Sequence, residues 1–422
     1  MDIFDQLLGD VPMPKFIKLR QDFPRPIIED IEGVLAKELI DKDLLKNIKK
    51  GQRIAITAGS RGVANIARII KEVVRLIKEV GGEPFIVPAM GSHGGSNAEG
   101  QTRVLHGMGI TEEFCGAPIL SSMEVVCIGE TDKGLPVYLD KYANEADGIV
   151  VMNRIKPHVG FRGPYESGVT KMITIGLGKQ KGAEVCHSLG FGEMAENLPA
   201  IASVVIEKKN IVFAIALLEN AYDETCKIVA MDKNNLLELE PALQQESKDM
   251  LAKIYFDKFD VLILDEIGKN ITGTGMDTNI IGRYHTPYIS GGPKITKLVV
   301  LDLTEESHGN GNGIGLADFT TRRFFEKMKF DQTYPNSITS TLQETIKLPM
   351  ILDTDKLSIQ GAIKTSNLKD YTTAKIVRIK NTLELEYIYI SESLLDEAKA
   401  HPHLEILSGP EELPFDEKNN IL

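Results

Sequence analysis

The sequence alternates short apolar runs with a helical pattern, and this alternation constrains the fold more than any other feature. Residues 53–59, RIAITAG, and residues 83–90, EPFIVPAM, are both typical of buried strands. Between them, residues 63–82 carry apolar side chains at helical spacing and end at two glycines. A strand, a helix and a strand within about forty residues predict a βαβ unit, which joins parallel strands.

The same pattern continues along the chain. Further central strands are expected at residues 147–153, 210–220, 260–268 and 297–304. A polar helix predicted over residues 236–256 is the best candidate for a connection between domains, because 422 residues exceed what one core normally holds. We therefore predict two α/β domains with mainly parallel sheets, residues 1–255 and 258–422, with the active site in the crevice between them.

Composition narrows the classes of function. The formal net charge of -12 argues against nucleic-acid binding, because phosphate contacts need a basic face. No apolar run approaches the ~20 residues that cross a bilayer, and the start, MDIFDQLLGD, lacks the basic and apolar regions of a signal peptide. The four cysteines form no CxxC pair and are typical of a reducing compartment: Cys115, Cys127, Cys186 and Cys226. We predict a cytoplasmic protein that acts on a small molecule and binds neither nucleic acid nor membranes.

Glycines and polar residues follow the first two predicted strands. Ser60 and Arg61 come just before a predicted helix, where main-chain N–H groups and a guanidinium favour an anion. His93 lies among glycines, including Gly94, that let a ligand approach the backbone, and a histidine there can act as a base near neutral pH. The alternatives are a capped helix with an exposed arginine, and a surface loop with an incidental histidine.

A third group of such residues lies within residues 153–188. His158 follows a proline, which favours a rigid extended backbone, and Lys171 follows Gly168 closely, as a lysine that contacts a phosphate would. The stretch does not match GxxxxGK[ST], so it is not a P-loop. His158 and His187 lack the HExxH spacing of zinc hydrolases, and a zinc site built from three histidines stays open as an alternative.

Taken in order, Arg61, His93, His158, Lys171 and His187 resemble the signature of the nickel-pincer lactate racemases. The motifs that carry the resemblance are GSHGG, KPHVGFRG, SGVTK and the downstream CH. The intervals agree closely, except that His158 and Lys171 stand a few residues further apart, through PYE at positions 164–166. The resemblance covers the first predicted domain well and the second weakly.

The resemblance implies a cofactor and a role for each of these residues. The cofactor is the nickel pincer nucleotide, a nickel pyridinium-3,5-dithio-type mononucleotide that maturation proteins supply. Lys171 would tether it through a thioamide, and His187 would complete the nickel coordination. His93 and His158 would be the catalytic residues that flank the substrate, and Arg61 would bind the cofactor phosphate or the substrate carboxylate. The remaining residues of the predicted cofactor site are Ser60, Gly94 and Gly168.

The implied reaction is chemically consistent with these residue types. The C2 hydrogen of a 2-hydroxy acid is too weakly acidic for simple deprotonation by histidine, and an enzyme can instead remove it as hydride to an electrophilic cofactor while a base takes the hydroxyl proton. Nickel suits imidazole and sulfur ligands. The resemblance therefore implies an isomerase, a racemase or epimerase of a 2-hydroxy acid. The alternatives are a non-catalytic nucleotide- or anion-binding protein of the same fold and a zinc-dependent hydrolase. The oligomeric state stays open, with a homo-oligomer as one option.

The second domain departs from the pattern of the family. Where the family has a DINLYQ-like segment and then a lysine, this chain has MDTNIIGRYH at residues 276–285. Gly282 stands in place of the glutamine and His285 in place of the lysine, with Arg283 as another cation for binding substrate. A wider and more polar site predicts a 2-hydroxy acid larger or more polar than lactate. Asp265 and Glu266, at the end of a predicted strand, are candidates for orienting a histidine.

Overall fold

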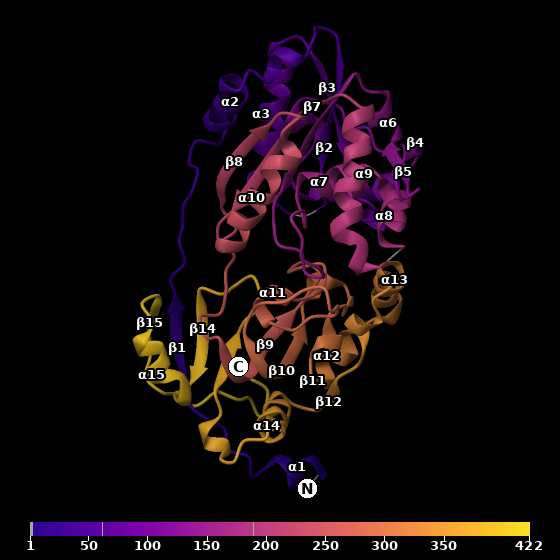
Figure 1. Cartoon of the computed structure of the whole chain (residues 1–422). Helices are drawn as coiled ribbons and strands as arrows, with labels where there is room; N and C mark the ends of the chain where they lie inside the picture. The colour runs from indigo at the N-terminus through magenta and orange to yellow at the C-terminus, as the bar shows by residue number, and fades with distance from the viewer. Residues whose placement is uncertain (1–2, 61, 189) are drawn as a thin grey trace. The chain divides into compact units, whose positions relative to one another are not determined.

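The protein consists of two compact units, seen here in a computed structural model that describes residues 3–60, 62–188 and 190–422 (Figure 1). One unit is residues 24–251, called here the inner unit. The other, called the terminal unit, joins residues 252–422 to the N-terminal segment that ends at Phe23. In the sequence, the inner unit ends at residue 251, close to the predicted boundary at residue 255. We expected the N-terminal segment in the first domain, whereas it belongs to the terminal unit.

The placement of the N-terminal segment follows from strand pairing. β1 (Phe16–Gln21) pairs antiparallel with β14 (Tyr387–Ser391) and with β15 (Leu404–Ile406), so it is part of the terminal sheet. Alternate residues of β1 are buried, as a strand with one covered face requires. The partners of β1 are more than 360 positions away in the sequence, so no local pattern indicates which sheet it joins.

The inner unit is built on a five-stranded sheet. Its order is β3 (Glu83–Pro88), β2 (Arg53–Ala58), β6 (Gly148–Arg154), β7 (Ile211–Glu219) and β8 (Thr225–Met231). All neighbours are parallel except β7 and β8. The expected α/β class and its mainly parallel sheets are therefore confirmed.

Helices cover both faces of this sheet, as a parallel sheet requires. α2 (Ile31–Asp41) and α3 (Ile66–Glu79) share one apolar core with β6, to which Val150 and Met152 contribute. Because side chains alternate along a strand, Asn153 points to the opposite face, where its amide reaches Gly168. The sheet therefore presents the end of β6 to the segment that contains Lys171.

The remaining elements of the inner unit are helices, of which α9 and α10 are long and the others short, and one hairpin. They are η1 (Leu45–Asn47), η2 (Gly94–Ser96), α4 (Ala98–Gly107), α5 (Glu112–Cys115), β4 (Val125–Glu130), β5 (Pro136–Asp140), α6 (Lys141–Glu145), α7 (Val169–Lys171), the π-helical turn η3 (Met172–Gly176), α8 (Lys179–His187), η4 (Phe191–Glu193), α9 (Met194–Lys208) and α10 (Leu236–Asp249).

The terminal unit is an eight-stranded mixed sheet. Its order is β12 (Met350–Leu352), β11 (Phe319–Thr321), β10 (Lys294–Leu303), β9 (Lys258–Ile267), β13 (Ile376–Ile379), β14, β1 and β15. The strands from β12 to β13 are parallel, and the pairs from β13 to β15 are antiparallel. The other elements are α1 (Ile3–Leu8), α11 (Thr278–Ile281), η5 (Glu305–Ser307), η6 (Ile314–Leu316), α12 (Arg322–Lys327), α13 (Phe330–Ser340), η7 (Gln343–Ile346), α14 (Asp355–Thr365), η8 (Tyr371–Thr373), η9 (Glu392–Leu394) and α15 (Leu395–Ala400).

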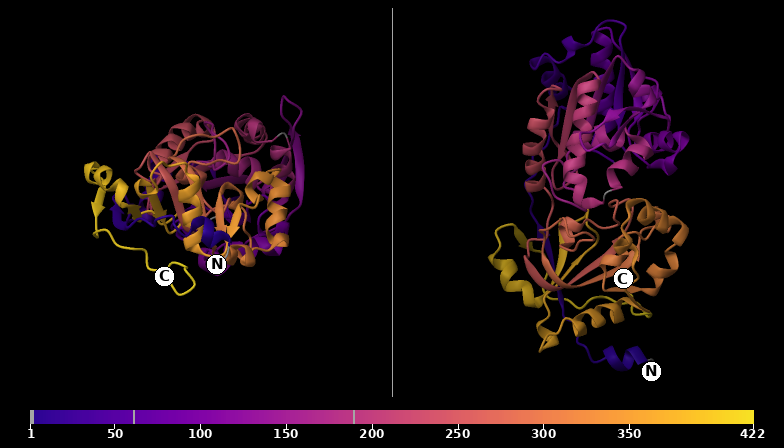
Figure 2. Two further views of the ribbon diagram at one scale, coloured as in Figure 1. Left: turned by 90° about the horizontal axis from the view of Figure 1, so that it is seen from below. Right: turned by 45° about the vertical axis from the view of Figure 1, so that its right-hand side comes forward.

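The N-terminal helix is held on the terminal unit by α14, and the two lie side by side in Figures 1 and 2. Gln360 of α14 is buried and donates its side-chain amide to the carbonyl of Val11 at 2.8 Å. Phe16 and Leu8 pack into the same apolar core as residues of α14, such as Ile359. The terminal unit is therefore completed by both ends of the chain.

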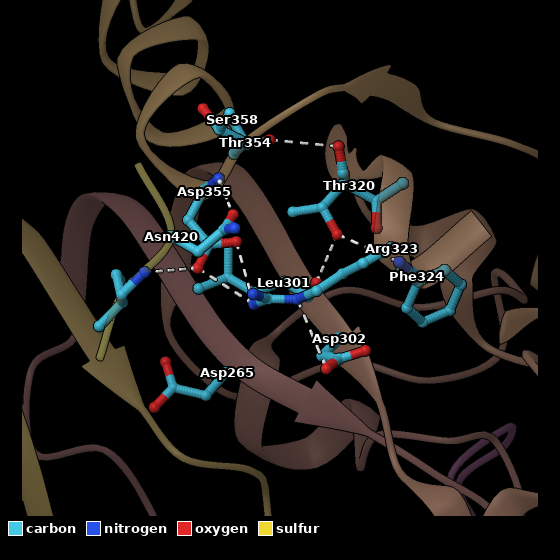
Figure 3. A network of polar contacts seen from close by, with 12 residues as sticks. Asp265, Leu301, Asp302, Thr320, Arg323, Phe324, Thr354, Asp355, Ser358 and Asn420 are labelled. Atoms are coloured by element: carbon cyan, nitrogen blue, oxygen red, sulfur yellow. Dashed lines mark hydrogen bonds and ion pairs between the residues drawn. The ribbon is translucent and has the colours of Figure 1, made fainter. Parts of the chain in front are cut away.

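Charged side chains pair at the carboxyl ends of the parallel strands of the terminal unit (Figure 3). Arg323 lies between Asp302 and the buried Asp355, at 3.4 and 3.0 Å. Arg378 binds both carboxylate oxygens of Asp265, at 2.7 and 2.9 Å. The suggestion that Asp265 orients a histidine is therefore wrong: its partner is an arginine of β13.

Asp355 also binds the C-terminal segment, because its Oδ2 accepts from the main-chain N–H of Ile421 at 2.9 Å. We expect Asp355→Ala to destabilise the terminal unit by about 2–3 kcal/mol, since it leaves Arg323 and this N–H without their buried acceptor. Denaturant unfolding measures the loss. Asp353→Ala is the matched control, because Asp353 is exposed and pairs with Arg322 at the surface, where we expect a loss of at most ~1 kcal/mol. Equal losses in the two variants would contradict this account.

Candidate functional site

The candidate site is organised by one helical segment, residues 169–187, which comprises α7, η3 and α8. It begins after Gly168, which has no side chain to cap it. The cap comes from α10: Glu240 Oε2 accepts from the N–H and the hydroxyl of Thr170, at 2.9 and 2.6 Å. A Cβ on Gly168 would lie 2.2 Å from Glu240 Oε1, so the glycine makes room for this carboxyl group. The segment carries Lys171 in its first turn and His187 in its last.

The carboxyl ends of three parallel strands meet this segment. Asn153 of β6 donates to the carbonyl of Gly168 at 2.9 Å. A Cβ on Gly59, just after β2, would lie 3.1 Å from the side chain of Met172. After β3, the N–H of Gly91 donates to the carbonyl of Gly176 at 3.4 Å. The expected convergence of strand ends therefore occurs, and the segment that bears Lys171 lies where they converge.

Lys171 and His187 influence each other electrostatically. Burial and, as the smaller effect, the positive charge of Lys171 together lower the pKa of His187 to about 4. His187 is therefore neutral at pH 7, which is the form of imidazole that ligates a metal. Its Nδ1 is buried and finds no hydrogen-bond partner among the residues that the structure describes.

The neighbouring thiol of Cys186 is buried and donates to Met194 Sδ at 3.6 Å. Burial raises the pKa of Cys186 to about 12. Among the described residues, no three His, Cys, Asp or Glu side chains are placed to hold a metal ion together.

His158 and His187 both contact the same aromatic ring, that of Phe191. The Phe191 ring is 5.4 Å from the His187 ring and 6.0 Å from the His158 ring, centroid to centroid. His158 also contacts Phe161 at 4.5 Å. The N–H of Gly160 donates to His158 Nδ1 at 3.0 Å, so the neutral ring carries its proton on Nε2. The structure therefore brings His158 and His187 together.

The loop that carries His158 is held by a buried carboxylate. Glu166 accepts from the N–H groups of His158 and Gly163, at 2.8 and 3.2 Å. Lys248 pairs with it at 2.6 Å and Arg162 at 3.4 Å. Glu166 belongs to the PYE stretch that lengthens the interval from His158 to Lys171. Sequence reasoning missed its role, because its partners come from its own loop and from distant α10.

His93 lies in the loop after β3 and pairs with the end of β2. The Oγ of Ser60 is 2.5 Å from His93 Nδ1, which joins two residues that the sequence suggested separately. His93 is exposed. Gly94 has φ 68°, and a Cβ there would lie 2.7 Å from the main-chain N of Gln101. The glycine is thus required by packing on α4. Arg61 lies outside the described residues.

Two substrate-binding candidates lie in the terminal unit. His285 is buried, and burial lowers its pKa to about 4. Arg283 pairs with Asp318 at 2.7 Å and donates to the carbonyls of Leu316 and Thr296, at 2.9 and 2.7 Å. Its guanidinium is therefore engaged within its own unit, which weakens its case as a substrate ligand.

A cavity of about 790 Å³ opens beside the loop of residues 91–97, which carries His93. Its lining includes Ser96 and Asn97 from that loop, Tyr142, and Lys181 of α8. It is polar and adjoins the predicted site without including its histidines.

Among the described helices, none is long and apolar enough to span a membrane.

Comparison with known proteins identifies the first part of the chain. Residues 16–198 match the family model of the lactate racemase N-terminal domain. The matched range includes His93, His158, Lys171 and His187, which lie on the helical segment and in the loops beside it. The resemblance drawn from the five ordered residues is thereby confirmed. No curated protein matches the chain.

Two solved structures resemble the whole chain. The lactate racemase apoprotein from Thermoanaerobacterium thermosaccharolyticum has 15% identity and a TM-score of 0.54, and the match covers 88% of this chain and 99% of that one. A protein from Thermotoga maritima has 12% identity and a TM-score of 0.52, with 86% and 99% covered. At these identities the likeness shows a shared fold, which includes the part of the chain beyond the lactate racemase domain.

The pH dependence of stability tests whether Glu240 is buried at the start of the helical segment. Burial raises the pKa of Glu240 to about 7 in the folded protein, against 4.5 ordinarily. The folded state then holds a proton that the unfolded state releases, so stability falls as pH rises from about 4.5 through 7. We expect Glu240→Gln to gain stability relative to the parent between pH 5 and pH 8, by up to roughly 3 kcal/mol.

Unfolding with denaturant at several pH values measures this difference. Glu238→Gln is the matched control, because Glu238 is exposed on the same helix. We expect its difference from the parent to stay constant with pH. A constant difference for Glu240→Gln as well would show that Glu240 does not take up a proton on folding.

Proposed function

We propose that the chain is an isomerase, a racemase or epimerase of a 2-hydroxy acid that works with the nickel pincer nucleotide. One observation carries the proposal: Lys171 and a neutral, partly buried His187 lie on one helical segment against the carboxyl ends of three strands. The lactate racemase family of residues 16–198 supports it. The cytoplasm, where the predicted maturation proteins would meet the chain, is its proposed location.

The residues fit this cofactor. The described residues offer no protein site with three metal donors, whereas His187 offers one neutral imidazole whose buried Nδ1 lacks a partner among them. A cofactor that supplies its own sulfur ligands to the metal needs a single donor from the protein, such as this imidazole. Lys171 would hold the group covalently, and Ser60 and Arg61 would bind its phosphate. Gly94 and Gly168 would contribute main-chain groups only, since neither has room for a side chain.

In the proposed reaction the protein handles the hydroxyl proton. When bound, the cofactor would supply an acceptor for the C2 hydrogen as hydride. His93 is suited to be the base in the tautomer whose Nδ1–H donates to Ser60 Oγ, since its Nε2 then carries no proton. The Nε2–H of a neutral His158 would hydrogen-bond the substrate oxygen, because the N–H of Gly160 occupies its Nδ1. To act as the base for the other enantiomer, His158 would carry its proton on Nδ1 instead and give up the hydrogen bond from Gly160.

The proposed substrate is larger or more polar than lactate. Arg61, His285 and Arg283 are the proposed substrate ligands, with His285 the stronger of the last two because Arg283 is already paired. A zinc-dependent hydrolase would need three protein ligands, which the described residues do not assemble. A non-catalytic nucleotide- or anion-binding protein would have no use for a tethering lysine beside a neutral histidine.

Intact-protein mass tests the tether. We expect the chain produced together with the cofactor-maturation proteins to carry a covalent adduct that Lys171→Ala lacks, because only the Lys171 amine would form the thioamide. Lys181→Ala is the matched control, since Lys181 is an exposed lysine on the same helical segment. An unmodified parent mass under these conditions, or an adduct that survives in Lys171→Ala, would exclude the proposed tether.

A substrate panel tests the predicted pocket. We expect kcat/KM for a sugar acid or a dicarboxylic hydroxy acid to exceed that for lactate by about tenfold or more, because each added hydrogen-bonding group contributes roughly 1–2 kcal/mol in a matched site. Steady-state racemisation followed by chiral chromatography measures the ratio. Lactate as the best substrate of the panel would contradict the prediction.

A further inference from the structure

A buried ion pair lies behind the loop of residues 91–97, called here the His93 loop. Lys179 Nζ is 3.2 Å from Asp140 Oδ2, and both side chains are fully buried. Burial raises the pKa of Asp140 and lowers the pKa of Lys179, and in each case the partner's charge opposes the shift. Replacing such a pair by apolar residues is often neutral or stabilising. Stability alone therefore does not account for this pair.

The backbone of Lys179 also indicates that its side chain is needed. Lys179 has φ 55°, in the left-handed region that costs a non-glycine residue about 1 kcal/mol. Glycines stand at positions 176, 178 and 182 of the same segment. A lysine at the left-handed position, where glycine would be favoured, points to a role for the ammonium group.

The ammonium group contacts the end of β3 directly and reaches the His93 loop through one intermediary, Gln101. Lys179 donates to the carbonyl of Pro88, the last residue of β3, and to Gln101 Oε1 at 3.1 Å. Because an ammonium only donates, the oxygen of Gln101 must face it, and the amide nitrogen must face the loop. That nitrogen donates to the carbonyls of Gly91 and His93, at 3.0 and 3.2 Å.

These contacts fix the loop at several main-chain points. The N–H of His93 donates to the carbonyl of Met90 at 3.1 Å. Gly91 and Gly94 both have positive φ, and a Cβ on Gly100 would lie 1.8 Å from the carbonyl oxygen of Gly94. The main chain of the His93 loop therefore packs closely against α4, and two of its carbonyls accept hydrogen bonds from Gln101. From this base the His93 ring reaches Ser60.

We propose that the Asp140–Lys179 ion pair, acting through Gln101, positions the His93 imidazole against Ser60. Lys179, Asp140 and Gln101 are positioning residues, since they act through the main chain of the loop. Asp140 keeps the ammonium charged and aimed, and it also caps α6 by accepting from the N–H of Ala143 at 2.9 Å. The inference rests on the proposed function only in taking His93 as the base.

The experiment follows the ring nitrogens of His93 by ¹⁵N NMR in the full chain. His93→Gln assigns the signal, and Ser60→Ala shows where the Nδ1 signal lies when the hydrogen bond to Ser60 is lost. We expect Gln101→Leu to move the Nδ1 signal toward its position in Ser60→Ala. Lys179→Met/Asp140→Asn should move it in the same way, since it removes both charges while Asn keeps the cap of α6. Gln360→Leu is the matched control, because it removes a buried glutamine that donates to a carbonyl in the terminal unit.

A wild-type Nδ1 signal in either folded variant would overturn the proposal, as would an equal shift in Gln360→Leu. If Gln101→Leu does not fold, the double variant decides. Failure of both to fold, with Gln360→Leu folded, would mean that these residues only support the fold, and would also overturn it.

The activity arm separates this proposal from the proposed function. We expect Gln101→Leu to lower kcat by about 10- to 100-fold with KM little changed, as misplacement of a catalytic group does. If His93→Gln racemises substrate as well as the parent does, the proposed role of His93 as base fails. The NMR measurement then still decides whether the ion pair positions the ring.

Discussion

The candidate site depends on how one helical segment is held against the ends of three strands. Residues 169–187 carry both Lys171 and His187, and their start has no cap of its own. Glu240 reaches from α10 to close this end, and Asn153 ties Gly168 to the sheet. Without these contacts the first turn, with Lys171 in it, would be free to fray. The geometry of the proposed tether and ligand is thus set by a carboxyl group about seventy residues away in sequence.

Buried carboxyl groups hold all three segments of the site. Glu240 holds the turn of Lys171, Glu166 holds the loop of His158, and Asp140 holds Lys179 behind the loop of His93. Each is costly to bury. Glu240 binds the N–H of Thr170 beside Lys171, Glu166 binds the N–H of His158 itself, and Asp140 pairs with Lys179, which reaches the His93 loop through Gln101. Such costs are typical of sites whose geometry must be kept within a fraction of an ångström. The terminal unit also contains paired charges, such as Asp265 with Arg378.

The local sequence pattern predicted most of the central strands, but it did not predict contacts between residues distant in the sequence. The strands β2, β3, β6, β7, β9 and β10 lie within a few residues of their predicted positions, since short apolar runs closed by glycine are a local signal. The helix expected to end at residue 256 ends at Asp249, and β1 joins a sheet formed by residues near 390, which no local pattern indicates. Ordered histidines and a lysine revealed the family. Glu240, Gln101 and Asp140 stayed hidden, because their function lies in partners distant in sequence.

The central claim is that His187 donates a neutral imidazole to a nickel ion whose other ligands come from a cofactor held by Lys171. X-ray absorption at the nickel edge, on protein from a cell that makes the cofactor, tests it most directly. The account predicts nickel with sulfur and imidazole nitrogen neighbours, and loss of the imidazole contribution in His187→Ala. Zinc in place of nickel, or a nickel spectrum that His187→Ala leaves unchanged, would contradict it.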